Sequence, residues 1–469
     1  MNLQKFFDEK ADNIKKWERR NKYYYSDLEK LCNFLIPENS SVLEIGCGTG
    51  NLLAALKPVK GLGIDFNQRM VEIAKKRHTT LMFRTASAET ADLDEKFDFI
   101  LLSDLIAYLN DAEEVFRNIK KAVYSKTRVI ITFHNYLWEP ILKLGEKFSL
   151  RSPQPKNLNW FSAEDVENLL FLADFEVVKK GKRMLLPKKV PLVSDFINRY
   201  VDKLPILNKV CLTQYIIARP INKNSNWQDK YSVSVIIPAR NEKGNIEDAI
   251  KRVPSMGKHT EIIFVEGNST DETWEEIKRV HEKYKSEKDI KIMRQDGRGK
   301  GDAVRKGFAN ASGDILMILD ADLTVRPEDL PKFYEAIASG KGEFINGSRL
   351  VYQMENNAMR FLNILGNKFF SLMFTWLLGQ RFKDTLCGTK VIFKEDYERL
   401  MRGRKFFGDF DPFGDFDLIF GASKLNLKII ELPIRYQERK YGSTNISRFK
   451  HGWILLRMCF FAMRKIKFF

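Results

Sequence analysis

Cysteine is scarce in this chain, and its pattern excludes two common ways of stabilising a fold. The five cysteines are odd in number, lie far apart and form no CxxC pair. A disulfide framework needs an even, closely spaced set, and a structural zinc site needs clustered thiolates. We therefore expect neither, and a reducing compartment fits this usage.

Long apolar runs are also lacking. The longest nearly uncharged stretch, FFSLMFTWLLGQ at residues 369–380, has twelve residues. A helix that crosses a bilayer core needs about 20. The N-terminal stretch MNLQKFFDEKADNIKK is charged throughout, so we expect no secretory signal. Both observations predict a cytoplasmic protein without a membrane-spanning helix.

Acidic residues are in deficit, with 61 Asp and Glu against 78 Lys and Arg, and the net charge is +17. Residues 439–469 hold eight basic side chains and no acid. Nucleic acid, an anionic membrane and phosphorylated substrates would all suit such a tail. In residues 451–469 large apolar side chains lie among the basic ones, and no RRM, KH or zinc pattern is present. We therefore expect peripheral binding to the cytoplasmic face of a membrane and no nucleic-acid partner, with a buried core helix as the competing interpretation.

Two domains are expected for a chain of 469 residues, because domains usually hold about 100–200 residues. Apolar runs alternate with helix-period segments over residues 41–178 and again over 231–330, the pattern of wound α/β domains. Between them NKNSNWQDK is polar and has no periodicity. We predict a first domain at residues 1–222, a linker at 223–230 and a second domain at 231–469.

A glycine-rich turn follows the first apolar strand in SVLEIGCGTGNLLAAL, residues 41–56. Its glycines allow a sharp turn and let a ligand approach the next helix without a Cβ clash. The following strand ends at Asp65, where a carboxylate accepts hydrogen bonds from ribose hydroxyls. The two segments predict a nucleotide-type cofactor site. Turns of an ordinary dinucleotide-type fold are the competing interpretation.

Together with FDFILLSDLIAYLND, these segments resemble the class I S-adenosylmethionine-dependent methyltransferases over residues 30 to about 220. The resemblance implies a Rossmann-like fold that ends in paired strands at FEVVKK and LTQYIIARPI, with S-adenosylmethionine as cofactor. It assigns the methionine and ribose side to Glu44, Gly46 and Gly48, the ribose to Asp65, and the closing wall of the pocket to Ser103 and Asp104.

The positions expected to contact the adenine and the methyl acceptor follow the family pattern less closely. The family commonly places an acid against the adenine, whereas this chain has Ser87 at that position and Glu89 two residues later. His134 and Asn135 end the apolar strand RVIITFHN, where open sheets bind ligands. They are either substrate contacts or a polar strand end. Methyl transfer can proceed by positioning two reactants, so it requires no catalytic base.

Two carboxylates follow another apolar strand in ILDADLTV, residues 318–325. In an extended chain residues i and i+2 project to the same side, so we expect Asp320 and Asp322 to face one site and Ala321 to point away. Two hard oxygen ligands suit Mg²⁺ or Mn²⁺ bridging a diphosphate. We predict that they hold a metal ion and a nucleotide-sugar diphosphate.

The stretch ILDADLTV and three other segments together resemble the family 2 glycosyltransferases of GT-A fold. Two of these segments precede it, YSVSVIIPARNEKGNIEDAI and TEIIFVEGNSTDETWEEI, and one follows it, RKYGSTNISR. The resemblance is particularly to the dolichyl-phosphate mannosyltransferase-like branch, and it covers residues 231 to about 450. It implies a nucleotide-diphosphate sugar as donor and a lipid phosphate or a glycan as acceptor. It places Pro238, Ala239, Arg240 and Glu242 around the nucleotide, Glu266 at the base, Asp320 and Asp322 at the metal and diphosphate, and Arg439 and Ser443 near phosphate groups.

One departure from the family concerns the base contact. Where the family has DDGS this chain has EGNS, so Glu266 keeps a carboxylate while Gly267 replaces the second acid. The identity of the nucleotide is therefore left open.

Four more acids stand close together in GDFDPFGDFD, at positions 409, 411, 415 and 417. Inverting transfer to a hydroxyl needs a base, whereas a lipid phosphate is already ionised. We predict that Asp415 or Asp417 acts as this base or positions the acceptor. Helix-capping acids are the alternative.

These motifs predict two wound α/β domains, an N-terminal Rossmann-like methyltransferase and a C-terminal GT-A glycosyltransferase. The predicted function is a bifunctional enzyme of glycan or glycolipid biosynthesis, with sugar transfer and methyl transfer in one chain. The alternative is a nucleic-acid or small-molecule methyltransferase with an accessory glycosyltransferase-like domain. A non-catalytic scaffold would need both sites to be inactive, which the retained glycines and acids argue against.

Overall fold

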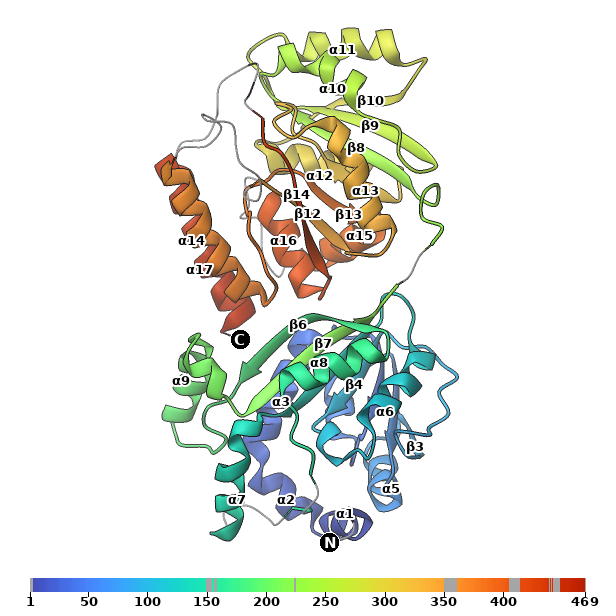
Figure 1. The fold of residues 1–469 in the computed structure, drawn as a ribbon, viewed down its shortest axis with the longest axis vertical. Coiled ribbons are helices and arrows are strands. Elements are labelled where there is room, and N and C mark those ends of the chain that lie inside the picture. The colour runs from blue at the N-terminus through green and yellow to red at the C-terminus, as the bar shows by residue number, and fades with distance from the viewer. Residues whose placement is uncertain are drawn as a thin grey trace. The chain divides into compact units, whose positions relative to one another are not determined.

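The computed structural model describes residues 3–148, 154–155, 158–222, 225–349, 361–404, 414–437, 439, 441 and 448–468, with the backbone alone at 361–365, 367, 415 and 448–452. The chain forms two compact units, Met1–Ile221 with Phe468–Phe469, and Asn222–Lys467. Each unit contains one seven-stranded sheet (Figure 1).

The sheet of the first unit has the strand order β3-β2-β1-β4-β5-β7-β6. Its strands are β1 (Ser41–Ile45), β2 (Lys60–Asp65), β3 (Met82–Thr85), β4 (Phe99–Ser103), β5 (Arg128–His134), β6 (Phe175–Arg183) and β7 (Thr213–Pro220). The first five run parallel, and β7 is antiparallel to both β5 and β6. The predicted pair of closing strands is confirmed.

Helices cover both faces of this sheet, because consecutive strand residues point to opposite sides. Val42 and Ile130 join a core with α3 (Lys22–Leu35), α4 (Asn51–Ala55) and α5 (Gln68–Arg77). Leu43 and Ile131 join the other core with α6 (Ala112–Ile119) and α8 (Ala163–Leu172). The remaining helices of this unit are α1 (Leu3–Asp12), α2 (Ile14–Arg20), α7 (Glu139–Lys147) and α9 (Val193–Arg199).

The sheet of the second unit has the strand order β10-β9-β8-β11-β13-β12-β14. Its strands are β8 (Ser232–Ala239), β9 (His259–Glu266), β10 (Asp289–Arg294), β11 (Ile315–Ile318), β12 (Phe344–Ser348), β13 (Lys390–Phe393) and β14 (Ile429–Pro433). Strand β13 is antiparallel to β11 and β12, and the other pairs are parallel. Both sheets are mixed, and the predicted pair of wound α/β domains is confirmed.

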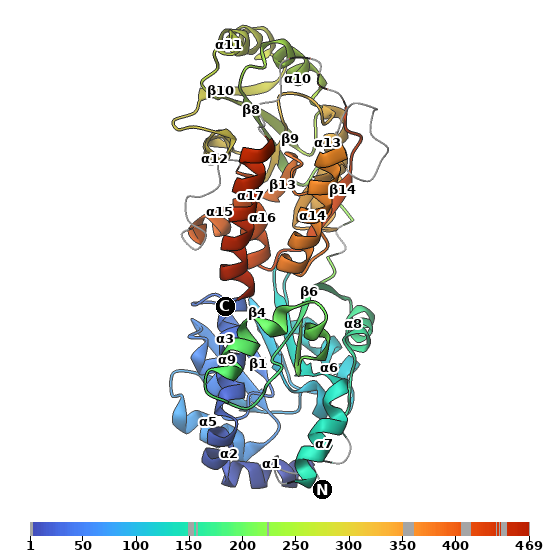
Figure 2. The same ribbon diagram turned by 90° about the vertical axis from the view of Figure 1, so that its left-hand side faces the viewer.

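The helices of the second unit are α10 (Ile246–Arg252), α11 (Thr273–Tyr284), α12 (Lys300–Asn310), α13 (Leu330–Ala338), α14 (Phe361–Leu378), α15 (Lys394–Arg402), α16 (Asp415–Lys424) and α17 (Arg448–Ala462). Helices α14 and α17 contact each other along one side of the unit (Figures 1 and 2). Helix α17 buries Leu455 and Met458 and exposes Trp453 and Phe460. Within the described ranges, no helix has both the length and the apolar character needed to cross a membrane.

The predicted linker ends against the second unit. The hydroxyl of Tyr334 donates to the carbonyl oxygens of Trp227 (3.0 Å) and Gln228 (2.9 Å). The rings of Trp227 and Tyr334 also pack together. These contacts fix the start of β8 relative to α13.

Candidate active sites

The glycine turn of the first unit lies between β1 and α4. Gly46, Gly48 and Gly50 have φ angles of +75°, +51° and +74°, which side chains disfavour. A Cβ on Gly46 would lie 2.8 Å from Leu105, whereas a Cβ on Gly48 would meet no atom within 4 Å. The sequence grouped these glycines together. The structure separates a glycine whose Cβ would press on the Leu105 side chain from one that has open space beside it.

Asp65 holds this turn in place. It is buried at the end of β2, and its carboxylate accepts hydrogen bonds from the amides of Gly48 (2.8 Å) and Asn67 (2.9 Å). Burial raises the pKa of Asp65, while the two amides oppose that shift. An ionised carboxylate has about four acceptor positions, so Asp65 keeps capacity for ribose hydroxyls.

Glu44 lies in β1 beneath the turn and is 2% exposed. Its Oε2 atom has no hydrogen-bond partner among the described residues. Burial raises the pKa of Glu44 to about 8, and the neighbouring charge of Asp65 adds to that rise. A buried polar atom left unpaired costs about 1–3 kcal/mol, so this oxygen is suited to a ligand that supplies a donor or a positive charge.

A polar cluster closes the other side of the turn after β4. Asp104 has a φ of +52°, and its amide donates to the carbonyl oxygen of Thr132 at 2.9 Å. Its carboxylate accepts a 2.6 Å hydrogen bond from Tyr24, and Ser103 lies 3.3 Å from the Thr132 hydroxyl. Tyr24 also packs against His134, with 5.7 Å between ring centroids. Sequence reasoning missed Tyr24, because α3 precedes every recognised motif.

Ser87, Glu89 and Asn135 make local contacts. Ser87 donates its hydroxyl to Glu89, and Glu89 also accepts from the amide of Asn110 at 3.3 Å. Asn135 is fully buried and donates to the carbonyl oxygens of Lys209 and Cys211, both at 3.0 Å. These contacts give Asn135 a loop-holding role, whereas His134 lies beside the polar cluster.

The two acids of ILDADLTV do not continue the strand. Strand β11 ends at Ile318, and the amide of Leu323 donates to the carbonyl of Asp320 at 3.1 Å, which closes a turn. The premise of an extended chain at Asp320 and Asp322 is therefore wrong, and Ala321 between them is buried. In the described part of the chain, no group of three or more His, Cys, Asp or Glu side chains is placed to hold a metal ion.

Each of these two acids meets a basic side chain. Lys300, the first residue of α12, lies 2.6 Å from Asp320. Burial alone would raise the pKa of Asp320, but Lys300, with smaller contributions from Lys390 and Arg349, lowers it below its ordinary value. Gly388 is needed here, because a Cβ at that position would lie 1.9 Å from the Asp320 carboxylate. Sequence reasoning did not single out Lys300, although its position in the glycine- and lysine-rich segment GRGKGDAVRKG could have identified it.

Asp322 shares its partner with Glu242. Arg439 donates to Asp322 and to Glu242, both at 2.8 Å, and Asn245 donates to the second oxygen of Glu242 at 2.7 Å. Burial raises the pKa of Glu242 to about 7, and the ion pair with Arg439 opposes that rise. Arg439 thus connects the loops that follow β8 and β11.

The predicted nucleotide frame lies at the ends of β8 and β9. Pro238 and Ala239 are the last residues of β8, and Ala239 is the register partner of Glu266. The Glu266 carboxylate is buried and accepts from the amide of Ser269 at 2.5 Å. Arg240 is exposed just beyond the strand. The strand ends therefore bring these residues together.

The acid-rich segment is described only in part. Asp409, Asp411, Ser443 and the side chain of Asp415 lie outside the described residues. A Cβ on Gly414 would lie 2.5 Å from the Cα of Gly301, so the start of α16 meets the start of α12 beside Lys300. Asp417 accepts from Arg404 at 3.4 Å. A role for Asp415 or Asp417 in catalysis stays a prediction.

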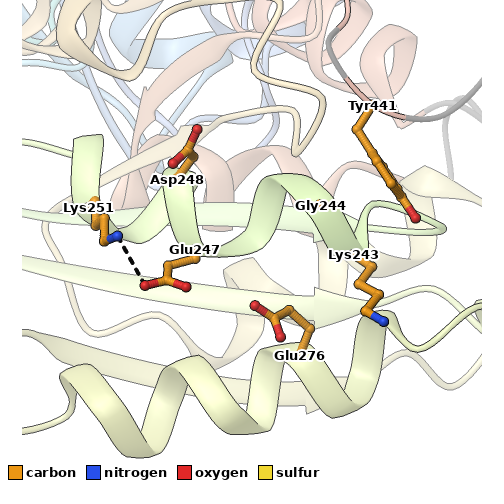
Figure 3. Close-up of a pocket in the computed structure, with 7 residues that line it drawn as sticks. All are labelled: Lys243, Gly244, Glu247, Asp248, Lys251, Glu276 and Tyr441. Atoms are coloured by element: carbon orange, nitrogen blue, oxygen red, sulfur yellow. Dashed lines mark ion pairs between the residues drawn. The ribbon is translucent and has the colours of Figure 1, made fainter.

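A hollow of about 480 Å³ lies over α10 and α11 and is lined by Lys243, Gly244, Glu247, Asp248, Lys251, Glu276 and Tyr441 (Figure 3). Glu247 on its wall pairs with Lys283 at 2.8 Å, Arg279 at 2.5 Å and Lys251 at 3.0 Å, and these cations lower the pKa of Glu247. The hollow is thus a solvated ion-pair surface. Tyr441 covers Gly244, where a Cβ would lie 2.6 Å from its ring, and this contact anchors the segment that carries Arg439.

Comparison with known proteins matches both units. The family model described as a methyltransferase domain matches residues 17–180, and the model of glycosyl transferase family 2 matches residues 234–404. The chain joins a methyltransferase domain to a family 2 glycosyltransferase domain.

Curated relatives match the glycosyltransferase unit. A dolichol-phosphate mannosyltransferase of Pyrococcus furiosus is 41% identical over 122 residues, which cover 25% of this chain and 33% of that protein. The low-salt glycan biosynthesis hexosyltransferase Agl6 of Haloferax volcanii is 28% identical over 229 residues, which cover 47% of this chain and 51% of that protein. The chain thus spans between a third and about half of the length of these two relatives.

One solved structure similar to part of this chain is described as a methyltransferase. It is a SAM-dependent methyltransferase of Thermotoga maritima, with 21% identity and a TM-score of 0.37, and the match covers 46% of this chain and 99% of that one.

Proposed function

We propose that this chain is a bifunctional enzyme of glycan or glycolipid biosynthesis that binds peripherally to the cytoplasmic face of a membrane. Its glycosyltransferase unit transfers a sugar, with inversion, from a nucleotide-diphosphate sugar to a polyprenyl-phosphate or glycan acceptor. Its methyltransferase unit transfers a methyl group, with the same glycan as the candidate acceptor. The two domain matches in one chain and the names of the curated relatives support this proposal.

The observation that carries the sugar-transfer half is the pairing of Asp320 with Lys300 and of Asp322 with Arg439. Protein Mg²⁺ sites commonly use one or two carboxylates and complete the shell with substrate phosphates and water, so two carboxylates suffice. Asp320 and Asp322 would hold Mg²⁺ or Mn²⁺, and the bound ion neutralises charge on the leaving diphosphate. Lys300 and Arg439 would then bind phosphate oxygens in place of the carboxylates.

The methyltransferase half rests on the fit of three residues to S-adenosylmethionine. Among the described residues Glu44 has a buried oxygen without a partner, and Gly48 has open space where a side chain would stand. Asp65 lies at the end of β2, where it would receive the ribose. The cofactor supplies the electrophilic methyl group. Asp65 would accept from the ribose hydroxyls, and Glu44 would face the positively charged methionine end.

Mass spectrometry of lipid-linked glycans tests the proposal. Cells that lack the protein should lose one sugar and one methyl group from a lipid-linked glycan, and the parent gene should restore both. Restoration with Asp322→Asn should return neither sugar nor methyl if methylation follows sugar addition, and restoration with Asp65→Ala should return the sugar alone. Unchanged lipid-linked glycans in the deletion strain would contradict the proposal.

A further inference from the structure

The long segment between β6 and β7, called the insertion below, exposes large apolar side chains and buries polar ones. Between β6 and β7, residues 184–212 form α9 and two short 3-10 turns, Val201–Lys203 and Leu207–Val210. Helix α9 buries Ser194 and Asn198 and exposes Phe196. Leu192 is 86% exposed and Ile206 is 81% exposed. Large apolar side chains thus reach the surface beside the charged Asp195 and Arg199, while the uncharged polar Ser194 and Asn198 are buried, unlike the usual surface helix in water.

Buried hydrogen bonds keep the insertion in this arrangement. The Asn198 side chain accepts from the amides of Leu185 and Leu186 and donates back to the Leu186 carbonyl, all within 2.9 Å. Buried Asp202 accepts from the amide of Met184 at 3.0 Å and pairs with Lys203 at 2.7 Å. These bonds satisfy the Asn198 side chain and one oxygen of Asp202, whose Oδ1 has no hydrogen-bond partner among the described residues, and they hold both side chains inward.

A second segment extends the same apolar surface. The Trp138 indole donates to the carbonyl of Val210 at 2.8 Å, which joins the short turn before α7 to the insertion. Helices α7 and α9 lie on the same side of this unit (Figures 1 and 2). Of 24 exposed large apolar side chains among the described residues, five lie in residues 136–148 and nine in residues 190–210. Scattered single cases are ordinary, but such a concentration marks an interaction surface.

The charge around this surface identifies its partner. Lys143 and Lys147 are exposed in residues 136–148, where Glu139 and Glu146 balance them and Glu139 pairs with Lys143 at 2.6 Å. Residues 184–212 hold five basic side chains against two acids, and Lys188 and Lys209 are exposed there. The exposed acid of the insertion, Asp195, is paired with Lys189 at 2.5 Å. An apolar face bordered by lysines matches the acyl boundary and the anionic headgroups of a membrane.

We propose that the segments 136–148 and 190–210 form a docking surface of the methyltransferase unit for an anionic lipid bilayer. The surface adjoins the polar cluster of Tyr24, Asp104 and His134, because Asn135, next to His134, holds the carbonyls of Lys209 and Cys211. Docking there brings the methyl-acceptor side to the membrane. The inference rests on the proposed function for its lipid-linked acceptor, but binding to vesicles requires no catalysis.

Environment-sensitive fluorophores on the full chain test this docking. All five native cysteines are buried, so a dye placed by Phe196→Cys or Ile206→Cys reports one position. Val59→Cys, at a residue 72% exposed on the same unit, is the matched control. With vesicles of phosphatidylcholine and phosphatidylglycerol, emission should shift to the blue at positions 196 and 206 and not at 59. Pure phosphatidylcholine vesicles should give a weaker shift.

The same vesicles provide an affinity comparison. Phe196→Asp with Ile206→Asp should weaken partitioning about tenfold, because two apolar side chains leave the lipid, while Val59→Asp should change it less than about twofold. Co-sedimentation without a dye shift at positions 196 and 206 would overturn the proposal, and so would equal shifts at all three positions or no binding. If the parent protein has neither transferase activity but the dyes at positions 196 and 206 still shift, the proposed function is wrong and the docking proposal stands.

Discussion

Arg439 donates a 2.8 Å hydrogen bond to Asp322, which precedes it by 117 residues. Its other terminal nitrogen donates to Glu242 at the same distance. The guanidinium therefore neutralises two acids from different strand ends in the proposed nucleotide-sugar site. We expect the donor diphosphate to compete with these acids for the same cation.

Substitution of Arg439 tests this competition. Arg439→Gln should raise KM for the nucleotide sugar by at least about tenfold, because a charge-assisted hydrogen bond contributes about 1.5–3 kcal/mol. The pKa of Glu242, already raised by burial to about 7, should rise further once its cation is gone. Steady-state kinetics across pH 6 to 9 measures both effects. Arg435→Gln, at an exposed position nearby in sequence, is the control. An unchanged KM would contradict a phosphate-binding role.

Sugar transfer should require a divalent cation together with Asp320 and Asp322. Asp322→Asn should reduce kcat by orders of magnitude, since the metal supplies several kcal/mol of leaving-group stabilisation. Methyl transfer to a supplied acceptor should persist in this variant, because its residues lie in the other unit. Transfer assays with Mg²⁺, with Mn²⁺ and with excess chelator provide the measurement. Full sugar transfer in chelator would reject the metal site.

S-adenosylmethionine binding should depend on Asp65. Asp65→Ala removes the acceptor for two ribose hydroxyls, each hydrogen bond worth about 0.5–3 kcal/mol, so affinity should fall at least about fivefold. It also releases the amides of Gly48 and Asn67, and a lower unfolding temperature should accompany the loss. Calorimetric titration measures the affinity, with Asp92→Ala, at an exposed acid of the same unit, as control. Undiminished binding would remove Asp65 from the cofactor site.

Glu44 should make cofactor affinity depend on pH. Burial raises its pKa to about 8, so at neutral pH the free protein holds this carboxyl mainly protonated. A cationic cofactor binds the ionised form better, and affinity should therefore increase from pH 6 to 8 by up to about tenfold per pH unit and then level off.

Glu44→Gln isolates this effect. The amino group of the cofactor titrates equally with both proteins, so the ratio of their dissociation constants reports Glu44 alone. That ratio should change between pH 6 and 8 and become constant above 8. A ratio independent of pH would show that Glu44 does not face the charged end of the cofactor.

The C-terminal helix predicts a second membrane contact, in the glycosyltransferase unit. Trp453 is 64% exposed and Phe460 is 66% exposed, whereas Leu455, Met458 and Cys459 are buried. Removing the tail would therefore also remove core side chains, and point substitutions are the sharper test. Trp453→Asp with Phe460→Asp should weaken co-sedimentation with anionic vesicles about tenfold. Equal partitioning of this variant and its parent would show that α17 is not an anchor.

Much of the fold was visible in the sequence, because it depends on local patterns. Apolar runs, glycine turns and helix periods predicted two wound α/β domains, and the strand orders confirm them. Placing Asp65, Ser103, Ala239 and Glu266 at strand ends followed from the same reasoning, since parallel strands end at one edge of a sheet. The wrong prediction at Asp320 and Asp322 has a local cause as well. Strand β11 ends at Ile318, two residues before Asp320, so the two acids lie in a turn and not in an extended strand.

The sequence by itself determined the wound α/β class of both units and most strand ends that carry site residues, since backbone preferences act over a few residues. The tertiary structure decided which charges meet. Tyr24 lies 80 residues before Asp104, and Arg439 lies 197 residues after Glu242. It also decided that the insertion before β7 faces its apolar side chains outward, because buried Asn198 and Asp202 bind backbone groups that no local pattern identifies. Pairings of this kind depend on the packing of distant segments, which periodicity along the chain does not encode.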